Sequence, residues 1–103
     1  MAQLITVFWR DIPAQVIARS GKKQSTKILL SKRFQEGIDR AAMRAGKGAS
    51  EAYLNDWRRE TVSCDNQDLA EQAQRLADSL EAAFSDEALE RLVKAKGDLN
   101  NLG

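Results

Sequence analysis

The side chains that most often carry enzyme chemistry are scarce in this sequence of 103 residues. It contains no histidine, and Cys64 is its only cysteine. Ser-His-Asp and Cys-His hydrolysis, imidazole general-base catalysis and histidine-ligated zinc all require histidine, and one cysteine cannot hold a zinc or iron–sulfur site within a single chain. We therefore expect a protein that is not an enzyme, with no metal site and no cofactor.

The residues that could still do chemistry have simpler structural interpretations. The Cys64 thiol would lie near the positive end of a following helix, which lowers a thiol pKa, but Asp65 opposes that shift and packing against the core is favoured. A catalytic carboxylate pair needs one member with a perturbed pKa in a cleft, which spacing alone does not show. Solvated helix charges are the favoured interpretation of Glu36, Asp39, Glu51 and Asp56.

Aromatic and charged side chains occur together at two places, where Trp9 precedes Arg10-Asp11 and Trp57 precedes Arg58. Such mixtures occur on nucleic-acid platforms, and a charged turn can meet a partner. An exposed turn and tryptophans at the core edge are the simpler interpretation, which we favour. If a partner binds, the candidate contact residues are Trp9, Arg10, Asp11, Trp57 and Arg58, together with Arg40 and Arg44 on the basic face of a helix.

Charge is distributed unevenly along the chain, although the net charge is only +1. Residues 1–59 contain 12 Lys and Arg against 5 Asp and Glu, whereas residues 60–103 contain 4 against 10. The basic half could bind nucleic acid, or the two halves could offset each other on the folded surface. We favour the second interpretation and expect no nucleic-acid partner; the residues a nucleic acid would use are Lys22, Lys23, Arg33, Arg40, Arg44 and Arg58.

The first thirty residues predict three strands. Only Thr6 interrupts the apolar residues of Leu4–Trp9, which is typical of an interior strand covered on both faces. Ala14–Arg19 alternates as a half-exposed strand does, and Pro13 belongs in the turn or at the first position of that strand. Ser25–Leu30 predicts a third, short strand.

Helices follow these strands. Ser31 has the chemistry of an N-cap for an amphipathic helix over Lys32–Ala45, and Ser50 that of an N-cap for a short helix that includes Trp57. The alternation in Arg58–Cys64 then predicts a fourth strand.

The last part of the chain predicts two more helices. Apolar residues recur at three- and four-residue spacing from Leu69, which predicts a helix of about 18 residues capped by Asp65 or Asn66. Ser85 is the expected cap of the final helix, Asp86–Lys96.

This order, β-β-β-α-α-β-α-α, predicts an α+β fold, with a three- to four-stranded, mostly antiparallel sheet and helices packed on one face. We expect one domain over residues 1–96 and a flexible tail over 97–103. If the first strand is covered on both faces, a second copy of the chain is the simplest cover for the face without helices, so a homodimer is expected. No apolar run is long enough to cross a bilayer and no secretion signal is visible, so a cytoplasmic location is expected.

Three segments resemble a small bacterial family described as virulence factor: VFWRDIPAQVIAR (Val7–Arg19), LLSKRFQEGIDRAAMRAG (Leu29–Gly46) and SEAYLNDWRRE (Ser50–Glu60). The resemblance covers roughly residues 3–90 and extends to a segment of conserved virulence factor C, where the domain accompanies helical-repeat and Nfu-type regions. It implies an accessory or assembly module. Because short members lie beside folate- and corrinoid-linked methyl-transfer genes, it also implies a one-carbon enzyme as partner. The family defines no functional residues to carry over.

Three functions remain open at this point. The first is a non-catalytic protein-interaction module with a protein partner. The second is an accessory subunit of a folate- or corrinoid-linked methyl-transfer enzyme, which only the resemblance implies. The third is nucleic-acid binding through the basic half.

Overall fold

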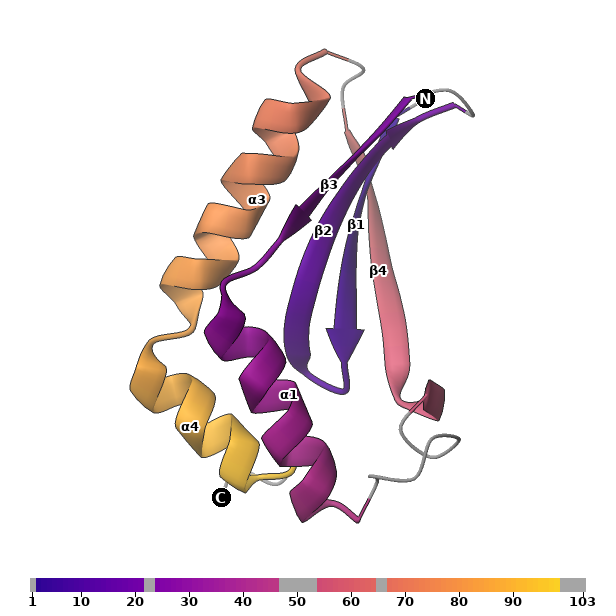
Figure 1. Cartoon of the computed structure of the whole chain (residues 1–103). Coiled ribbons are helices and arrows are strands. Elements are labelled where there is room, and N and C mark those ends of the chain that lie inside the picture. The colour runs from indigo at the N-terminus through magenta and orange to yellow at the C-terminus, as the bar shows by residue number, and fades with distance from the viewer. Residues whose placement is uncertain (1, 22–23, 47–53, 65–66, 99–103) are drawn as a thin grey trace.

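The computed structural model describes residues 2–21, 24–46, 54–64 and 67–98 and consists of a four-stranded antiparallel sheet with helices packed against it (Figure 1). The predicted α+β class and the order of strands and helices are confirmed. The short helix expected from Ser50 lies mostly outside the described residues, and Trp57, which we placed in it, is instead the first residue of a strand. The elements are β1 (Ala2–Trp9), β2 (Ile12–Ser20), β3 (Gln24–Leu29), α1 (Lys32–Arg44), β4 (Trp57–Cys64), α3 (Leu69–Ala83) and α4 (Asp86–Lys94).

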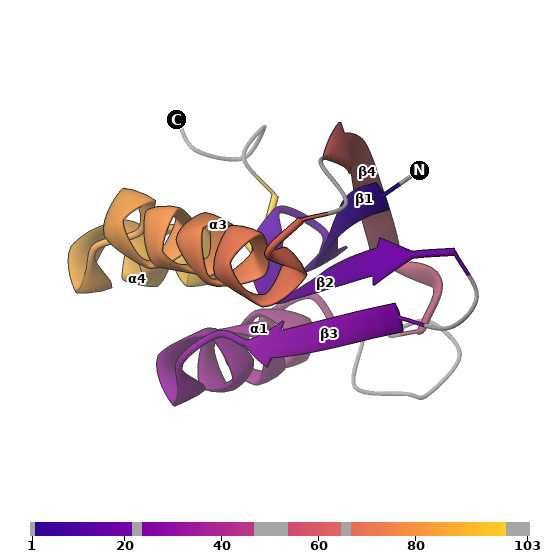
Figure 2. The ribbon, with the colours of Figure 1, turned by 90° about the horizontal axis from the view of Figure 1, so that it is seen from above.

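The strands are arranged in the order β3-β2-β1-β4 and every neighbouring pair is antiparallel. The prediction that Leu4–Trp9 is an interior strand is therefore confirmed, because β1 lies between β2 and β4. In the described part of the chain, β3 and β4 form the two edges. The helices lie toward the β3 edge: α3 packs on β2 and β3, and α1 packs on β2 and α4 (Figures 1 and 2). As a result, β4 lies at the edge remote from the helices.

One face of the sheet forms the main core with the helices. Val16 and Ala18 of β2 are fully buried there, together with Phe34 and Ile38 of α1. Directly paired residues of neighbouring strands share a face. The β1 residues paired with Val16 and Ala18, and the β4 residues paired in turn with those, therefore lie on this same helix-covered side. The side chains of this row on β4 are Glu60 and Val62, and both are exposed because the helices do not reach that far.

The opposite face, called here the second face, includes Ile5 and Val7 of β1 and Ile17 of β2. Ile5 is 4% exposed and Val7 is 7% exposed within a single copy of the chain. A second copy is therefore not needed to bury these residues. The burial of this face within a single copy removes our reason for expecting a homodimer through it, although the dimer itself stays a prediction.

The β1–β2 hairpin contains a register shift between Val7 and Phe8. Val7 pairs with Gln15 and Phe8 with Pro13, so β2 carries one extra residue at this point. Pro13 is the second residue of β2, close to the strand start where a residue without an N–H group is tolerated. The extra residue adds twist at the hairpin end, where Trp9 and Ile12 join the same buried cluster as the helices.

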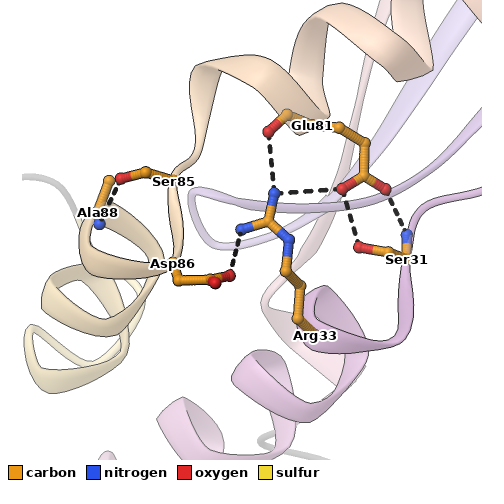
Figure 3. Close-up of polar contacts among 6 residues, drawn as sticks. All are labelled: Ser31, Arg33, Glu81, Ser85, Asp86 and Ala88. Carbon is orange, nitrogen blue, oxygen red and sulfur yellow. Dashed lines mark hydrogen bonds and ion pairs between the residues drawn. The ribbon is translucent and has the colours of Figure 1, made fainter.

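The start of α1 is held by α3 through an acidic side chain (Figure 3). Ser31 occupies the predicted N-cap position, but its hydroxyl makes no capping bond to the helix. Instead, the Ser31 N–H and hydroxyl donate to the two carboxylate oxygens of Glu81, at 2.6 and 2.8 Å. Arg33 completes the cluster by donating to the Glu81 carbonyl at 2.9 Å and by forming an ion pair with its carboxylate at 3.2 Å.

These contacts set the pKa of Glu81. Burial disfavours the carboxylate and raises its pKa, but the hydrogen bonds from Ser31 and the Arg33 charge favour it more strongly, so the pKa lies below its ordinary value. Arg33 also pairs with Asp86 at the start of α4, at 3.2 Å. One small cluster thus joins the first turn of α1 to the junction between α3 and α4.

The predicted ends of the later elements are partly confirmed. Ser85 caps α4 as expected, by accepting a hydrogen bond from the Ala88 N–H at 3.1 Å (Figure 3). Helix α3 begins at Leu69, the first residue of the predicted apolar spacing, and has 15 residues, fewer than expected. Its N-cap position is Asp68, so the predicted cap at Asp65 or Asn66 is wrong.

Helix α4 ends at Lys94 instead of the predicted Lys96, and the Gly97 carbonyl that follows accepts a hydrogen bond from the Asp11 N–H of the β1–β2 turn at 2.8 Å. Gly97, which we assigned to the tail, is buried with a φ of 79°. A Cβ atom at this position would lie 2.9 Å from the Trp9 ring, so only glycine fits both the backbone and the space.

Candidate functional site at the hairpin end and the edge strand

The predicted contact residues separate into two groups in space. Five of them gather around the β1–β2 turn: Trp9, Arg10 and Asp11 form the turn region, and Trp57 and Arg58 begin β4 beside it. Trp57 is paired directly with Trp9. The other two, Arg40 and Arg44, lie on α1 and take no part in this arrangement of the turn and β4.

Arg10 holds the turn by both its backbone and its side chain. Its backbone has a φ of 54°, a conformation that costs energy for a residue with a side chain. Its N–H donates to the Asp56 carbonyl at 2.9 Å, and its Nε pairs with the Asp56 carboxylate at 3.2 Å. Its Nη1 donates to the Lys96 carbonyl at 2.9 Å. The strained turn is thus tied to the segment before β4 and to the segment after α4.

Arg58 joins β4 to the same turn. Its Nε donates to the Arg10 carbonyl at 2.7 Å, its Nη2 pairs with Asp11 at 3.0 Å and its Nη1 pairs with Glu60. The guanidinium also lies over the Phe8 ring, 4.3 Å from the ring centroid. Burial lowers the pKa of Arg58, but the bonds to Glu60 and Asp11 outweigh it, so the net pKa is raised and the residue keeps its charge.

This geometry makes most of the predicted contact residues structural. Trp9 is fully buried, so it cannot touch a partner directly. Arg10, Asp11 and Arg58 are engaged with one another and with Asp56, so the turn is a partly buried ion-pair cluster and not the exposed turn that we favoured. The cluster of Arg10, Asp11, Asp56 and Arg58 is called here the turn clasp.

Most of the described residues that we proposed to bind nucleic acid also form ion pairs within the chain. Arg33 pairs with Glu81 and Asp86, and Arg40 pairs with Glu90 at 2.9 Å. Arg44 is exposed, and Lys22 and Lys23 lie outside the described residues. The ion pairs of Arg33 and Arg40 join the basic half of the sequence to the acidic half, in agreement with the interpretation that the two halves offset each other.

A different set of cations was not singled out by the sequence. Arg19, Lys27 and Arg59 are exposed and lie on the second face of the sheet, on β2, β3 and β4. Among the described sheet residues, this face carries no acidic side chain. The three residues are called here the cationic triplet. Only the register of the strands reveals it, because its members are up to forty residues apart.

A cleft of about 600 Å³ lies beside the turn clasp. In the described part of the chain it is lined by Val7, Gln15, Trp57, Arg58 and Arg59. Within that same part, no three Cys, Asp or Glu side chains lie close enough together to hold a metal ion. Cys64 is partly buried at the end of β4 and does not join the core where we expected it to pack.

The outer edge of β4 is the clearest candidate for binding. The strand pairs with β1 at all eight positions without a bulge, and none of its residues is a proline. Proteins usually protect such edges with proline, bulges, charges or very short strands. The charges of β4 lie in its first half, whereas Thr61-Val62-Ser63-Cys64 is uncharged and Val62 is 56% exposed. This second half is called here the open edge.

The other edge is better protected. Strand β3 has only six residues and carries Lys27 near its middle, a common means of preventing strand addition. Sequence reasoning identified Arg58–Cys64 as a strand but not as an edge, because strand order depends on pairing between distant segments.

Together these features define a small α+β protein with an antiparallel sheet, a clasped hairpin and, in the described part of the chain, an edge strand whose second half is uncharged. The chain belongs to the virulence factor family, whose model matches residues 7–93. No curated protein and no solved structure is significantly similar to it. Among the described residues, no helix is long and apolar enough to cross a membrane.

Proposed function

We propose that this protein is a non-catalytic interaction module of the cytoplasm that binds an extended segment of a partner protein along the open edge of β4. The observation that carries the proposal is the uninterrupted, uncharged edge over Thr61-Val62-Ser63-Cys64, whose first three residues are exposed. An added strand would obtain backbone hydrogen bonds from this edge and side-chain contacts from its two faces.

The turn clasp supports this role by fixing the start of β4. Arg58 holds the strand to the hairpin turn through the Arg10 carbonyl and Asp11, and Arg10 holds Asp56 just before the strand. A preorganised edge loses less conformational entropy when a partner strand adds to it. The clasp is therefore a positioning device for the strand.

The test compares two substitutions of exposed apolar residues. Val62→Lys places a charge on the open edge, whereas Met43→Lys makes the same change on α1, where Met43 is 73% exposed. Wild type and both variants would be used as baits in a lysate of the source organism. We expect Met43→Lys to capture the same protein as wild type and Val62→Lys to lose it. If Val62→Lys retains that protein, the proposed function is wrong.

Nucleic-acid binding is a second candidate, with different residues from those that the sequence suggested. The cationic triplet favours it, because exposed cations on a face without described acidic residues attract polyanions. A variant with Gln at Arg19, Lys27 and Arg59 should lose any salt-dependent binding of short RNA or DNA. A control with Gln at Lys32, Arg44 and Lys94, which removes the same charge from the helices, should keep it. Absence of binding by wild type at low salt would reject this candidate.

The accessory role beside a methyl-transfer enzyme stays a prediction, since no feature of the described residues bears on it.

A further inference from the structure

The geometry points to a second copy of this chain as an occupant of the open edge, through antiparallel pairing of β4 with β4 of the partner copy around Val62. This inference rests on the proposed function of the edge and adds the partner and the register. The resulting dimer would have one continuous sheet of eight strands with a two-fold axis between the two β4 strands.

Symmetry restricts the registers that are available. In an antiparallel two-fold pair that continues the sheet with its faces matched, one residue must lie directly opposite its own copy. Centres at Arg58, Arg59 or Glu60 would place two like charges opposite each other, which is destabilising. Centres at Trp57, Ser63 or Cys64 would leave at most three residue pairs within β4. Only Thr61 and Val62 remain.

The centre at Val62 pairs apolar and hydroxyl side chains nearest the two-fold axis. Val62 faces its own copy, which covers an apolar side chain that is 56% exposed. Thr61 then faces Ser63 twice, and hydroxyl side chains are good cross-strand partners. Glu60 faces Cys64 twice, with no like charges opposed. In the alternative centred on Thr61, Arg59 faces Ser63 and Arg58 faces Cys64, which draws the turn clasp into the interface.

The helices do not obstruct this pairing. In both views they lie toward the β3 edge, so β4 is the side of the molecule that another sheet can approach (Figures 1 and 2). For the same reason they add no area to the contact. Edge pairing alone buries less than the ~800 Å² per partner of a standard stable interface, so the dimer should form at high protein concentration and exchange rapidly.

Disulfide trapping tests both the partner and the register, because Cys64 is the only native cysteine. In a Cys64→Ser background, Val62→Cys places two thiols opposite each other only in the register centred on Val62, and Thr61→Cys does so only in the other. Met43→Cys, on exposed α1, measures random collision. We expect Val62→Cys to cross-link at least tenfold faster than Met43→Cys. Faster cross-linking of Thr61→Cys would keep the dimer and overturn the register.

Sedimentation of the chain with its native cysteine replaced by serine provides the second measurement. From about 10 μM to about 1 mM, the range of weak dimerisation constants, the mean mass should rise toward twice the monomer mass, and Val62→Lys should remain monomeric. A monomer over the whole range, with no cross-linking above the Met43→Cys control, would overturn the inference. If Val62→Lys still lost a captured partner protein in that case, the proposed function would stand while the dimer failed.

Discussion

The Glu81 cluster gives the sharpest test of how the helices are held, through the substitution Glu81→Gln. The carboxylate accepts bonds of 2.6 and 2.8 Å from Ser31 and pairs with Arg33 at 3.2 Å. Hydrogen bonds to a charged group contribute roughly 1.5–3 kcal/mol each, but the Glu81 side chain is 31% exposed and solvent reduces this. Glutamine keeps one acceptor oxygen, so we expect a loss of about 1–2 kcal/mol at pH 7.

The pH dependence of the free energy of unfolding provides an independent test of the role of Glu81. The folded-state pKa of Glu81 is lowered, so its stabilisation is present above the unfolded-state pKa and is lost as pH falls through the folded-state pKa. Below about pH 4, under the ordinary glutamate value, the difference between wild type and Glu81→Gln should therefore shrink. Urea unfolding at pH 7 and near pH 3 measures both free energies.

Glu71→Gln is the matched control for this experiment. Glu71 lies on the same helix and pairs with Arg75 four residues away, but both side chains are exposed. Pairs of this kind contribute roughly 0.3–0.5 kcal/mol. If the two substitutions changed the free energy of unfolding equally, or if the effect of Glu81→Gln persisted unchanged near pH 3, the assignment of Glu81 as the anchor of α1 would be refuted.

Three further substitutions test the hairpin end by thermal or urea unfolding. Gly97→Ala should destabilise the fold by about 2–4 kcal/mol because its Cβ meets the Trp9 ring. The control Gly21→Ala, also at positive φ but with no atom within 4 Å, should cost only about 1–2 kcal/mol. Equal effects would contradict the close contact between Gly97 and Trp9. Trp9→Ala should cost about 3–5 kcal/mol because the side chain is fully buried, and a change near zero would rule out its place in the core. Arg58→Lys should cost about 1–2 kcal/mol, since lysine cannot hold the Arg10 carbonyl and Asp11 together, and wild-type stability would mean that the clasp is dispensable.

The fold could be read from the sequence where local pattern decides the structure. The apolar run at Leu4–Trp9 defined an interior strand, and the three- and four-residue spacing from Leu69 defined the start of α3. The Ser85 cap was also predictable, because the hydroxyl bonds to a residue only three positions away. In each case the determining contacts are close along the chain or are summarised by hydrophobic periodicity.

The contacts that were missed join distant residues. Ser31 looked like a helix cap, but its hydroxyl bonds to Glu81, fifty positions later, so its chemistry was recognised and its partner was not. Gly97 was assigned to a tail because it follows the last helix, although a glycine at this place is also a common helix end, and that signal could have been used. Trp9 and Arg58 were singled out as candidate contacts because composition cannot distinguish an exposed aromatic-basic cluster from one that clasps a turn.

The uneven distribution of charge along the sequence leads to ion pairs between the two halves in the folded chain. Arginines of the basic half pair with acids of the acidic half, as Arg33 does with Glu81 and Arg40 with Glu90, so part of the separated charge is neutralised by folding itself. A partner is therefore best looked for on surfaces without these ion pairs. Two such places exist in the described part of the chain, the cationic triplet on the second face and the uncharged open edge of β4. The triplet lies on the face opposite the helices and the open edge lies at the sheet edge remote from them. Strand β4 contributes to both, which makes it the first place to test for a partner.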